Sequence, residues 1–332
     1  MIPHSLPMTL LANSKVKPVH FRERRQQAND SYMPDAIPVL RGCKRIALCT
    51  YPTFEIEGYF LNGLDILDMY WSCPPGLVAA TSCIVYRNDI HHIVTVCPLG
   101  SSSEERSRPS SFMRCHSMEP SHAVTIENQS RNVFIAGDTM TQRFDLGRFT
   151  GFPHPDGSAG LSVAATPNQV LTGTRIGNIY IWDVRTRPHR PACSFRPSKK
   201  HSAVTDLKLS TDGNYLYVSC MRNKSNNLAK WDLRKYSSEP AVVFNGHRNS
   251  HKSLKFDIEE TTTGGILLAG GDDSVVRAWN THTSGTGVEC ARLPGEIPKL
   301  VKFAGWGKES PAAPGAWIVS NVGKYVMQCG QR

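Results

Sequence analysis

Short apolar runs separated by turn residues fill the chain from about residue 37 onward, and helical periodicity is nearly absent. The clearest set predicts strands over 253–258, 265–270 and 275–279, with a tight turn at 271–274. Closely spaced strands of this length are typical of proteins built from small antiparallel sheets. We therefore predict an all-β fold.

Sets of three such strands recur along the chain at a nearly constant interval. The best-defined repeats cover 155–198, 199–245 and 246–292. The further expected strands are 161–165, 169–173 and 178–182, then 204–209, 215–220 and 227–231, then 132–136 and 141–145, the stretches 45–59 and 77–96, and finally 299–303, 316–322 and 325–329.

Two of these repeats close their third strand with nearly the same tetrapeptide. They are Trp182-Asp183-Val184-Arg185 and Trp231-Asp232-Leu233-Arg234, 49 residues apart, and Trp279-Asn280-Thr281-His282 follows 48 residues later without the charges. Self-similarity with a Trp-Asp ending every ~40 to 50 residues marks a propeller blade, a four-stranded sheet that buries its faces against its neighbours. On these residues the chain resembles the WD-repeat family of β-propellers.

The blade interval also predicts the domain organisation. Residues 37–332 supply about seven blades at roughly 40 to 45 residues each. Residues 1–36 carry Pro3, Pro7 and Pro18 and then a charged segment, and we expect them to form a flexible tail. A strand from one terminus should complete the blade at the other terminus, because an open sheet edge promotes aggregation.

The WD-repeat resemblance implies a buried hydrogen-bond network in each blade. Its members are a His near the blade start, a Ser or Thr on the second strand, an Asp in the following turn and the closing Trp. The matching residues are Thr172 and Trp182 in one blade, His201, Ser219 and Trp231 in the next, and His247, Asp273 and Trp279 in the third. No blade has the full set, since Ile176 replaces the Asp in the first and Ala269 replaces the hydroxyl in the third. We therefore expect apolar packing between blades to hold the fold.

The Asp and Arg of each tetrapeptide lie two positions apart, so they should share one side of the strand while the Trp turns into the core between blades. A planar guanidinium oriented by a carboxylate suits bidentate recognition of acidic or carbonyl groups on a partner. The pair of tetrapeptides resembles the double WDxR box of substrate receptors of cullin-4 RING ubiquitin ligases. The resemblance implies that Asp183, Arg185, Asp232 and Arg234 contact the ligase adaptor, the large subunit of the damaged-DNA-binding protein. The alternative is that each Arg only forms an ion pair within the propeller.

Composition favours some partners and chemistries over others. A formal net charge of +10 favours acidic partners.

Phosphate-loop, HExxH and GxSxG motifs are absent from the sequence, so we expect a protein that is not an enzyme and holds no cofactor. The adjacent His91 and His92 should face opposite sides of a strand, so we expect no metal site there. The ten cysteines contain no CxxC pair, which predicts reduced thiols in the nucleus or cytoplasm. Because no apolar stretch is long enough to cross a bilayer, we expect no membrane partner.

Two functions follow from these observations. The first is a substrate receptor that docks the ligase adaptor and presents an unknown, possibly acidic, protein substrate. The second is a scaffold in a nuclear chromatin or RNA-processing assembly without a ligase link. Direct nucleic-acid binding is less favoured, because the sequence shows no aromatic stacking platform.

The Ser-rich segment 101–111 is either a flexible insertion or a phosphorylated loop.

Overall fold

The structure is a computed structural model, and every regular element among the residues it describes is a strand. The described residues are 8–10, 45–49, 56–61, 65–72, 77–86, 89–98, 113–116, 119–127, 129–130, 132–145, 148–186, 190–197, 202–221, 227–235, 239–250, 254–261, 264–304, 315–320 and 324–329. Side chains are described for most of these residues from Glu119 onward. The Ser-rich segment 101–111 lies outside the described residues.

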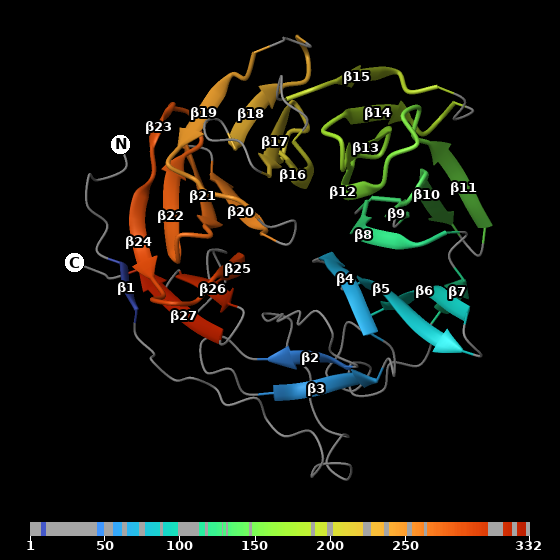
Figure 1. The fold of residues 1–332 in the computed structure, drawn as a ribbon, viewed down its shortest axis with the longest axis horizontal. Helices are drawn as coiled ribbons and strands as arrows, with labels where there is room; N and C mark the ends of the chain where they lie inside the picture. The colour runs from blue at the N-terminus through green and yellow to red at the C-terminus, as the bar shows by residue number, and fades with distance from the viewer. Residues whose placement is uncertain are drawn as a thin grey trace. The chain divides into compact units, whose positions relative to one another are not determined.

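The strands group into two compact units, residues 21–195 and residues 1–20 with 196–332, called here the first and the second unit. The described strands form seven sheets in total, the number of blades predicted from the repeat length. Within nearly every sheet, strands that follow one another in sequence pair antiparallel (Figure 1).

The first unit contains four sheets. They are β2 (Arg45–Cys49) with β3 (Ile56–Leu61); β4 (Asp65–Ser72), β5 (Leu77–Tyr86), β6 (Asp89–Pro98) and β7 (Met113–His116); β8 (Ser121–Ile126), β9 (Val133–Gly137), β10 (Met140–Asp145) and β11 (Arg148–Pro153); and β12 (Gly160–Ala165), β13 (Gln169–Thr174), β14 (Ile179–Asp183) and β15 (Cys193–Phe195).

The second unit contains three sheets. They are β16 (Val204–Leu209), β17 (Tyr215–Cys220), β18 (Leu228–Asp232) and β19 (Val242–Asn245), extended by β23 (Gly285–Thr286), which runs parallel to β19; β20 (Phe256–Thr261), β21 (Gly264–Gly270), β22 (Val275–Asn280) and β24 (Val288–Arg292); and β25 (Pro298–Ala304), β26 (Gly315–Ser320) and β27 (Lys324–Cys329) with β1 (Met8–Leu10).

Strand β1 completes the last sheet. It pairs antiparallel with β27, with Met8 opposite Cys329 and Leu10 opposite Met327. This pairing confirms the expectation that one terminus supplies a strand to the blade at the other. Residues 8–10 lie inside the segment 1–36 for which the sequence predicted a tail, and the rest of that segment lies outside the described residues.

The tryptophan that closes a blade packs against an aromatic residue on the last strand of the preceding sheet. In the first unit the ring of Trp182 lies 6.0 Å from that of Phe152 on β11. In the second unit Trp279 lies 6.4 Å from Phe244 on β19. All four side chains are buried, as the sequence predicted for the tryptophans, so each junction between these sheets contains a large aromatic core.

Buried aspartates add polar links between consecutive sheets of the second unit. Asp206 on β16 accepts a hydrogen bond from the backbone N–H of Phe256 on β20 at 3.1 Å, and Asp257 on β20 accepts one from the N–H of Phe303 on β25 at 3.0 Å. Lysines accompany both carboxylates, with Lys255 Nζ 3.4 Å from Asp206 and Lys302 Nζ 3.5 Å from Asp257. The buried carboxylates are thus both hydrogen-bonded and charge-compensated, as burial requires.

Candidate functional site

Each Trp-Asp-x-Arg box lies at the end of the third strand of its sheet. Strand β14 ends at Asp183 and β18 ends at Asp232. The next residue of each box is hydrogen-bonded to the turn that precedes the second strand of its sheet. The N–H of Val184 donates to the carbonyl of Asn168, and the N–H of Leu233 donates to that of Asn214, both at 2.9 Å. The backbone bends at this point. This bend leaves the tryptophan in the core and brings the arginine to the surface.

In the first box, Arg185 forms a bidentate ion pair with Asp183 through one edge of its guanidinium. Nε donates to Oδ1 at 2.9 Å and Nη2 donates to Oδ2 at 2.7 Å. The backbone N–H of Arg185 also donates to Oδ1, at 2.9 Å. The arginine side chain nevertheless stays 66% exposed, and its Nη1 has no hydrogen bond to a described residue.

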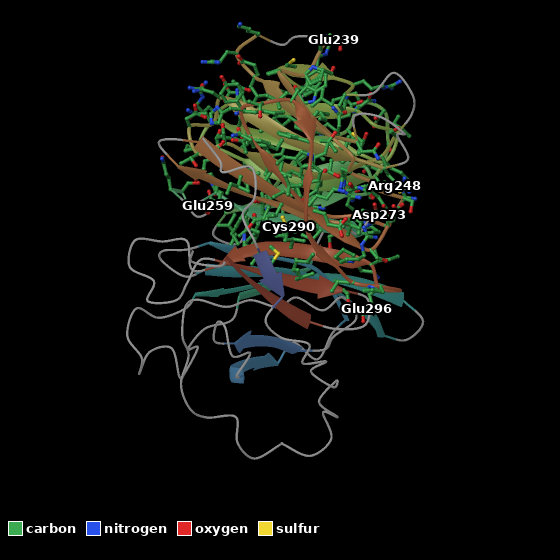
Figure 2. The ribbon with its side chains drawn as sticks, turned by 90° about the vertical axis from the view of Figure 1, so that its left-hand side faces the viewer. Glu239, Arg248, Glu259, Asp273, Cys290 and Glu296 are labelled. Atoms are coloured by element: carbon green, nitrogen blue, oxygen red, sulfur yellow. The ribbon has the colours of Figure 1, made fainter. Side chains whose placement is uncertain are left out.

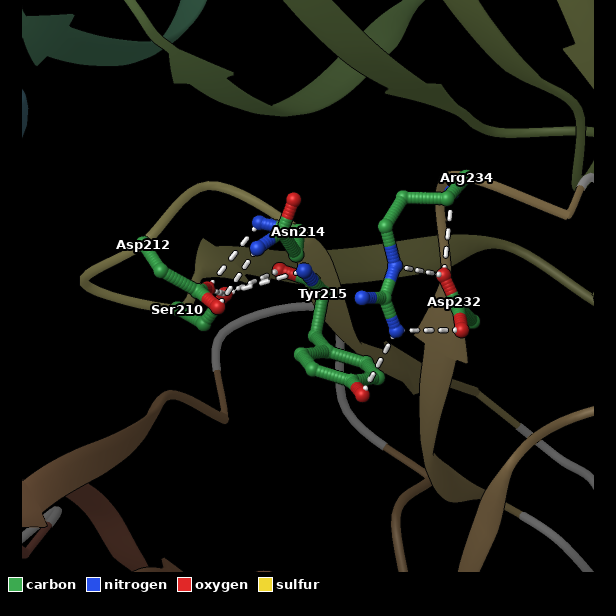
Figure 3. Close-up of polar contacts among 6 residues, drawn as sticks. All are labelled: Ser210, Asp212, Asn214, Tyr215, Asp232 and Arg234. Atoms are coloured by element: carbon green, nitrogen blue, oxygen red, sulfur yellow. Dashed lines mark hydrogen bonds and ion pairs between the residues drawn. The ribbon is translucent and has the colours of Figure 1, made fainter.

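The second box repeats this geometry and adds one contact (Figure 3). Arg234 donates from Nε and Nη2 to the two oxygens of Asp232 at 2.9 and 2.8 Å, and its backbone N–H donates to Oδ1 at 3.0 Å. Nη2 donates further to the hydroxyl of Tyr215 at 2.9 Å. The Arg234 side chain is 54% exposed. Nη1 is again without a hydrogen bond to the described part of the chain.

The ion pairs are fully charged at neutral pH. The hydrogen bonds from Arg185 lower the pKa of Asp183 to about 2, and those from Arg234 lower the pKa of Asp232 to about 2. The same bonds raise the pKa of each guanidinium. Each box therefore displays a fixed cation whose orientation is set by the carboxylate two residues before it, as the sequence predicted.

The third tetrapeptide forms the same backbone turn without the charges. The N–H of His282 donates to Oδ1 of Asn280 at 2.8 Å, which corresponds to the backbone bond in the two charged boxes. An amide and an imidazole cannot form the side-on ion pair, so only two of the three boxes present an oriented arginine.

The residues of the expected blade network belong to links between sheets. Thr172 on β13 shares a hydrogen bond of 2.5 Å with the hydroxyl of Thr141 on β10 of the preceding sheet. Thr141 in turn bonds Nε2 of His154 at 3.0 Å, and Nδ1 of His154 bonds the carbonyl of Ser158 at 2.8 Å. The indole N–H of Trp182 has no partner among the described residues. Thr172 and Trp182 are therefore both buried but not bonded to each other.

Sequence reasoning missed His154. Its ring lies 6.0 Å from that of Trp182, and burial lowers its pKa, so it is neutral and acts as a hydrogen-bonding group. A signal existed, because His154 precedes its closing Trp182 by 28 residues, close to the 32 residues between His247 and Trp279.

The next blade uses an asparagine from its neighbour. Ser219 on β17 receives hydrogen bonds from the hydroxyl of Thr205 at 3.3 Å and from Nδ2 of Asn249 at 3.1 Å. Trp231 is buried. His201, the histidine expected to begin this network, lies outside the described residues.

In the third blade, Asp273 is hydrogen-bonded to Arg277 and not to His247. Asp273 forms a bidentate ion pair with Arg277, at 3.0 and 2.6 Å, and its carboxylate lies near Arg248 (Figure 2). His247 is buried edge-on to Trp279 at 6.1 Å, and its Nδ1 has no partner among the described residues. The indole N–H of Trp279 donates to the carbonyl of Asn245 at 2.9 Å, which fits the absence of a hydroxyl at Ala269.

Other classes of site find no support in the described residues. They contain no group of three or more His, Cys, Asp or Glu side chains that could hold a metal ion. A search of the same residues finds no helix with the length and hydropathy needed to cross a membrane.

No family model matches the chain. Among curated proteins it is 25% identical over 174 residues to the protein transport protein SEC31 of Coccidioides immitis, covering 49% of this chain and 12% of that one. It is 30% identical over 113 residues to the human DDB1- and CUL4-associated factor 4, covering 34% of this chain and 21% of that one. The chain thus spans less than a quarter of the length of either relative.

Solved structures match far more of the chain. The β-propeller domain of Cps50 (Swd1) from Myceliophteria thermophila superposes with a TM-score of 0.62 at 12% identity, covering 91% of this chain and 98% of that domain. The fold is a β-propeller. Raptor from Chaetomium thermophilum gives a TM-score of 0.63 at 17% identity, covering 87% of this chain and 26% of that one. At these identities the likeness shows the fold alone.

Proposed function

We propose that this WD-repeat propeller is a non-enzymatic substrate receptor of a cullin-4 RING ubiquitin ligase. Asp183 with Arg185 and Asp232 with Arg234 dock the adaptor, the large subunit of the damaged-DNA-binding protein. The observation that carries this proposal is the shared geometry of the two boxes: each arginine is held side-on by its own aspartate, is more than half exposed, and has no hydrogen bond from Nη1 to a described residue.

This geometry suits docking because the arginines are exposed and already oriented. Binding then costs less side-chain entropy than ordering a free arginine, which amounts to about 0.5–1.5 kcal/mol for each immobilised side chain. The unused N–H groups require an acceptor, so the matching surface of the adaptor should present carbonyl or carboxylate oxygens. Ion pairs that are this exposed contribute little to the stability of the fold. Recognition of a partner therefore explains better than folding why two boxes share the same ion-pair geometry.

The relatives lend partial support. The human protein that is 30% identical over 113 residues is named for association with DDB1 and CUL4. The net charge of +10 favours an acidic protein as the substrate that the rest of the surface presents. A receptor of this kind acts in the nucleus, the cytoplasm or both.

A capture experiment tests the proposal against a matched control within the chain. Arg292 forms the same side-on pair with Glu289, at 2.9 and 2.6 Å, and is 56% exposed, but it lies outside the boxes. The full chain and its Arg185→Ala/Arg234→Ala and Arg292→Ala variants are expressed with an affinity tag, and co-purifying adaptor is quantified. We expect the adaptor to co-purify with the wild type and with Arg292→Ala. The amount of adaptor recovered with the double variant should be at least tenfold lower.

Equal recovery of the adaptor with all three proteins would show that the boxes do not dock it. Absence of the adaptor from every sample, with chromatin or RNA-processing proteins in its place, would favour the scaffold function.

A further inference from the structure

The two boxes differ in the residue that faces the aspartate across the sheet. Tyr215 on β17 pairs with Asp232, whereas Gln169 on β13 pairs with Asp183. The tyrosine forms a hydrogen bond with the arginine of its box, whereas the described hydrogen bonds of Arg185 go to Asp183 and none goes to Gln169. The two arginines therefore share one ion-pair geometry but differ in how firmly they are held.

Tyr215 holds Arg234 in two ways. Its hydroxyl accepts a hydrogen bond from Nη2 at 2.9 Å, and its ring centroid lies 5.1 Å from Cζ of the guanidinium. Both hydrogens of Nη2 are thereby used, one by Asp232 and one by Tyr215. Arg234 keeps only its Nη1 edge for a partner, whereas Arg185 also keeps one hydrogen on Nη2.

The tyrosine is itself fixed by the turn that precedes it (Figure 3). Its backbone N–H donates to the hydroxyl of Ser210 at 2.9 Å, and that hydroxyl bonds Asp212 at 2.5 Å. Asp212 also accepts the backbone N–H of Asn214 at 3.0 Å and its side-chain amide at 2.7 Å. The turn thus anchors the start of β17 from which the Tyr215 ring extends toward Arg234.

A second cation supports the ring. Nζ of Lys230 lies 4.1 Å from the centroid of Tyr215 and donates to the carbonyl of Thr281 at 3.3 Å. Lys230 is buried, and the corresponding position of the first box holds Ile181. The ring therefore contacts one buried cation, Lys230, and one exposed cation, Arg234, and such contacts restrict its movement.

We propose that Tyr215 is a positioning residue that pre-orders Arg234, so that the second box contributes more to adaptor affinity than the first. This inference rests on the proposed docking function. Pre-ordering one long side chain corresponds to about a three- to tenfold gain in affinity. Arg234→Ala should accordingly weaken binding more than Arg185→Ala.

A double-mutant cycle tests the proposal with the full chain and purified adaptor. Tyr215→Gln copies the residue of the first box and is expected to weaken binding about three- to tenfold, whereas Tyr215→Phe keeps the ring and should weaken it less. In an Arg234→Ala background, Tyr215→Gln should change the affinity by less than about twofold, because its effect acts through the arginine.

Tyr217→Phe serves as the matched control, because its hydroxyl donates to Glu260 at 2.8 Å and not to Arg234. Its adaptor affinity should equal that of the wild type. Circular dichroism and the melting temperature of each variant show whether the fold is retained, and Tyr215→Phe provides a measurement if Tyr215→Gln does not fold.

Wild-type affinity in both Tyr215 variants, combined with weak binding by Arg234→Ala, would overturn the positioning role and leave the docking function intact. An equal loss from Tyr215→Gln with and without Arg234 would overturn it too, since the tyrosine would then act independently. A wild-type chain that does not bind the adaptor would overturn both the docking function and this inference.

Discussion

The hydroxyls of Thr141 and Thr172 share a hydrogen bond between two consecutive sheets of the first unit, and both side chains are fully buried. His154 extends this link through its bond to Thr141. The polar network expected within single blades therefore also connects neighbouring sheets in the described structure.

Thr172→Val should destabilise the protein by about 1–2 kcal/mol, because it removes one partner and leaves the buried hydroxyl of Thr141 with fewer bonds. Urea unfolding followed by tryptophan fluorescence provides the measurement. The half-buried Thr150 on β11 supplies the control, since Thr150→Val should change the unfolding free energy by less than about 0.5 kcal/mol. Equal effects from the two substitutions would contradict a stabilising role for the link.

Gly287 permits the indole of Trp279 to lie against the backbone. A Cβ at this position would lie 2.3 Å from Cε2 of Trp279 and 2.6 Å from its Nε1, whereas one at Gly285 would meet nothing within 4 Å. Gly287→Ala should therefore cost about 1–3 kcal/mol through displacement of the indole, and Gly285→Ala much less. The two melting temperatures compare them directly, and a Gly287→Ala protein as stable as the wild type would show that the indole moves freely.

The sequence predicted strands where short apolar runs lie between clear turns, and it missed several strands that lack this pattern. It predicted β16 and β17 at both ends, because each is a short run rich in apolar residues that lies between clear turns. It missed β15, whose three residues are largely accessible, and β1, whose role depends on a partner more than 300 residues away. Edge strands of this kind are defined by pairing and not by a hydrophobic pattern.

The candidate site was predictable to a similar extent. The spacing of Asp183 and Arg185 sufficed to predict their pairing, since the pairing depends only on two residues that are two positions apart in the sequence. Tyr215 was not predictable as a contact of Arg234, because the cross-strand register that places it opposite Asp232 is a property of the folded sheet. The same holds for Asn249, which reaches Ser219 from the following repeat.

Asp257 should be the most sensitive of the inter-sheet aspartates. Its carboxylate is buried, accepts the N–H of Phe303 and lies 3.4 Å from Lys208 and 3.5 Å from Lys302. Asp257→Asn removes the charge that compensates both lysines and should cost about 1–3 kcal/mol. Glu289→Gln, which breaks an exposed pair with Arg292, should cost less than about 1 kcal/mol. Denaturant titration gives the unfolding free energy of both variants. A larger loss from Glu289→Gln than from Asp257→Asn would contradict the stabilising role of Asp257.

His247 makes stability depend on pH. Burial, with the nearby Arg277, lowers its pKa from 6.5 to about 4, although Asp272 and Asp273 act in the opposite direction. In the unfolded chain the imidazole takes up a proton below about pH 6.5, but in the folded protein it does so only near pH 4. Stability is therefore lost as the pH falls from about 6.5 toward 4, with a slope of up to about 1.4 kcal/mol per pH unit.

The measurement is the unfolding free energy at pH 7, 6 and 5 for the wild type and for His247→Gln. The variant cannot take up this proton, so its free energy should fall less steeply with acidification. Parallel pH profiles would show that His247 does not carry the effect. His154, whose pKa is also lowered by burial, is present in both proteins and contributes equally to each.

The most direct test of the central claim is a binding titration between the purified full chain and the purified large subunit of the damaged-DNA-binding protein. The account predicts saturable binding by the wild type and by Arg292→Ala, and a loss of affinity of about a hundredfold or more when both Arg185 and Arg234 are replaced by alanine, as expected for two hydrogen-bonded arginine contacts. Affinity that is unchanged by removal of both arginines, or a wild-type chain that does not bind the adaptor, would contradict it.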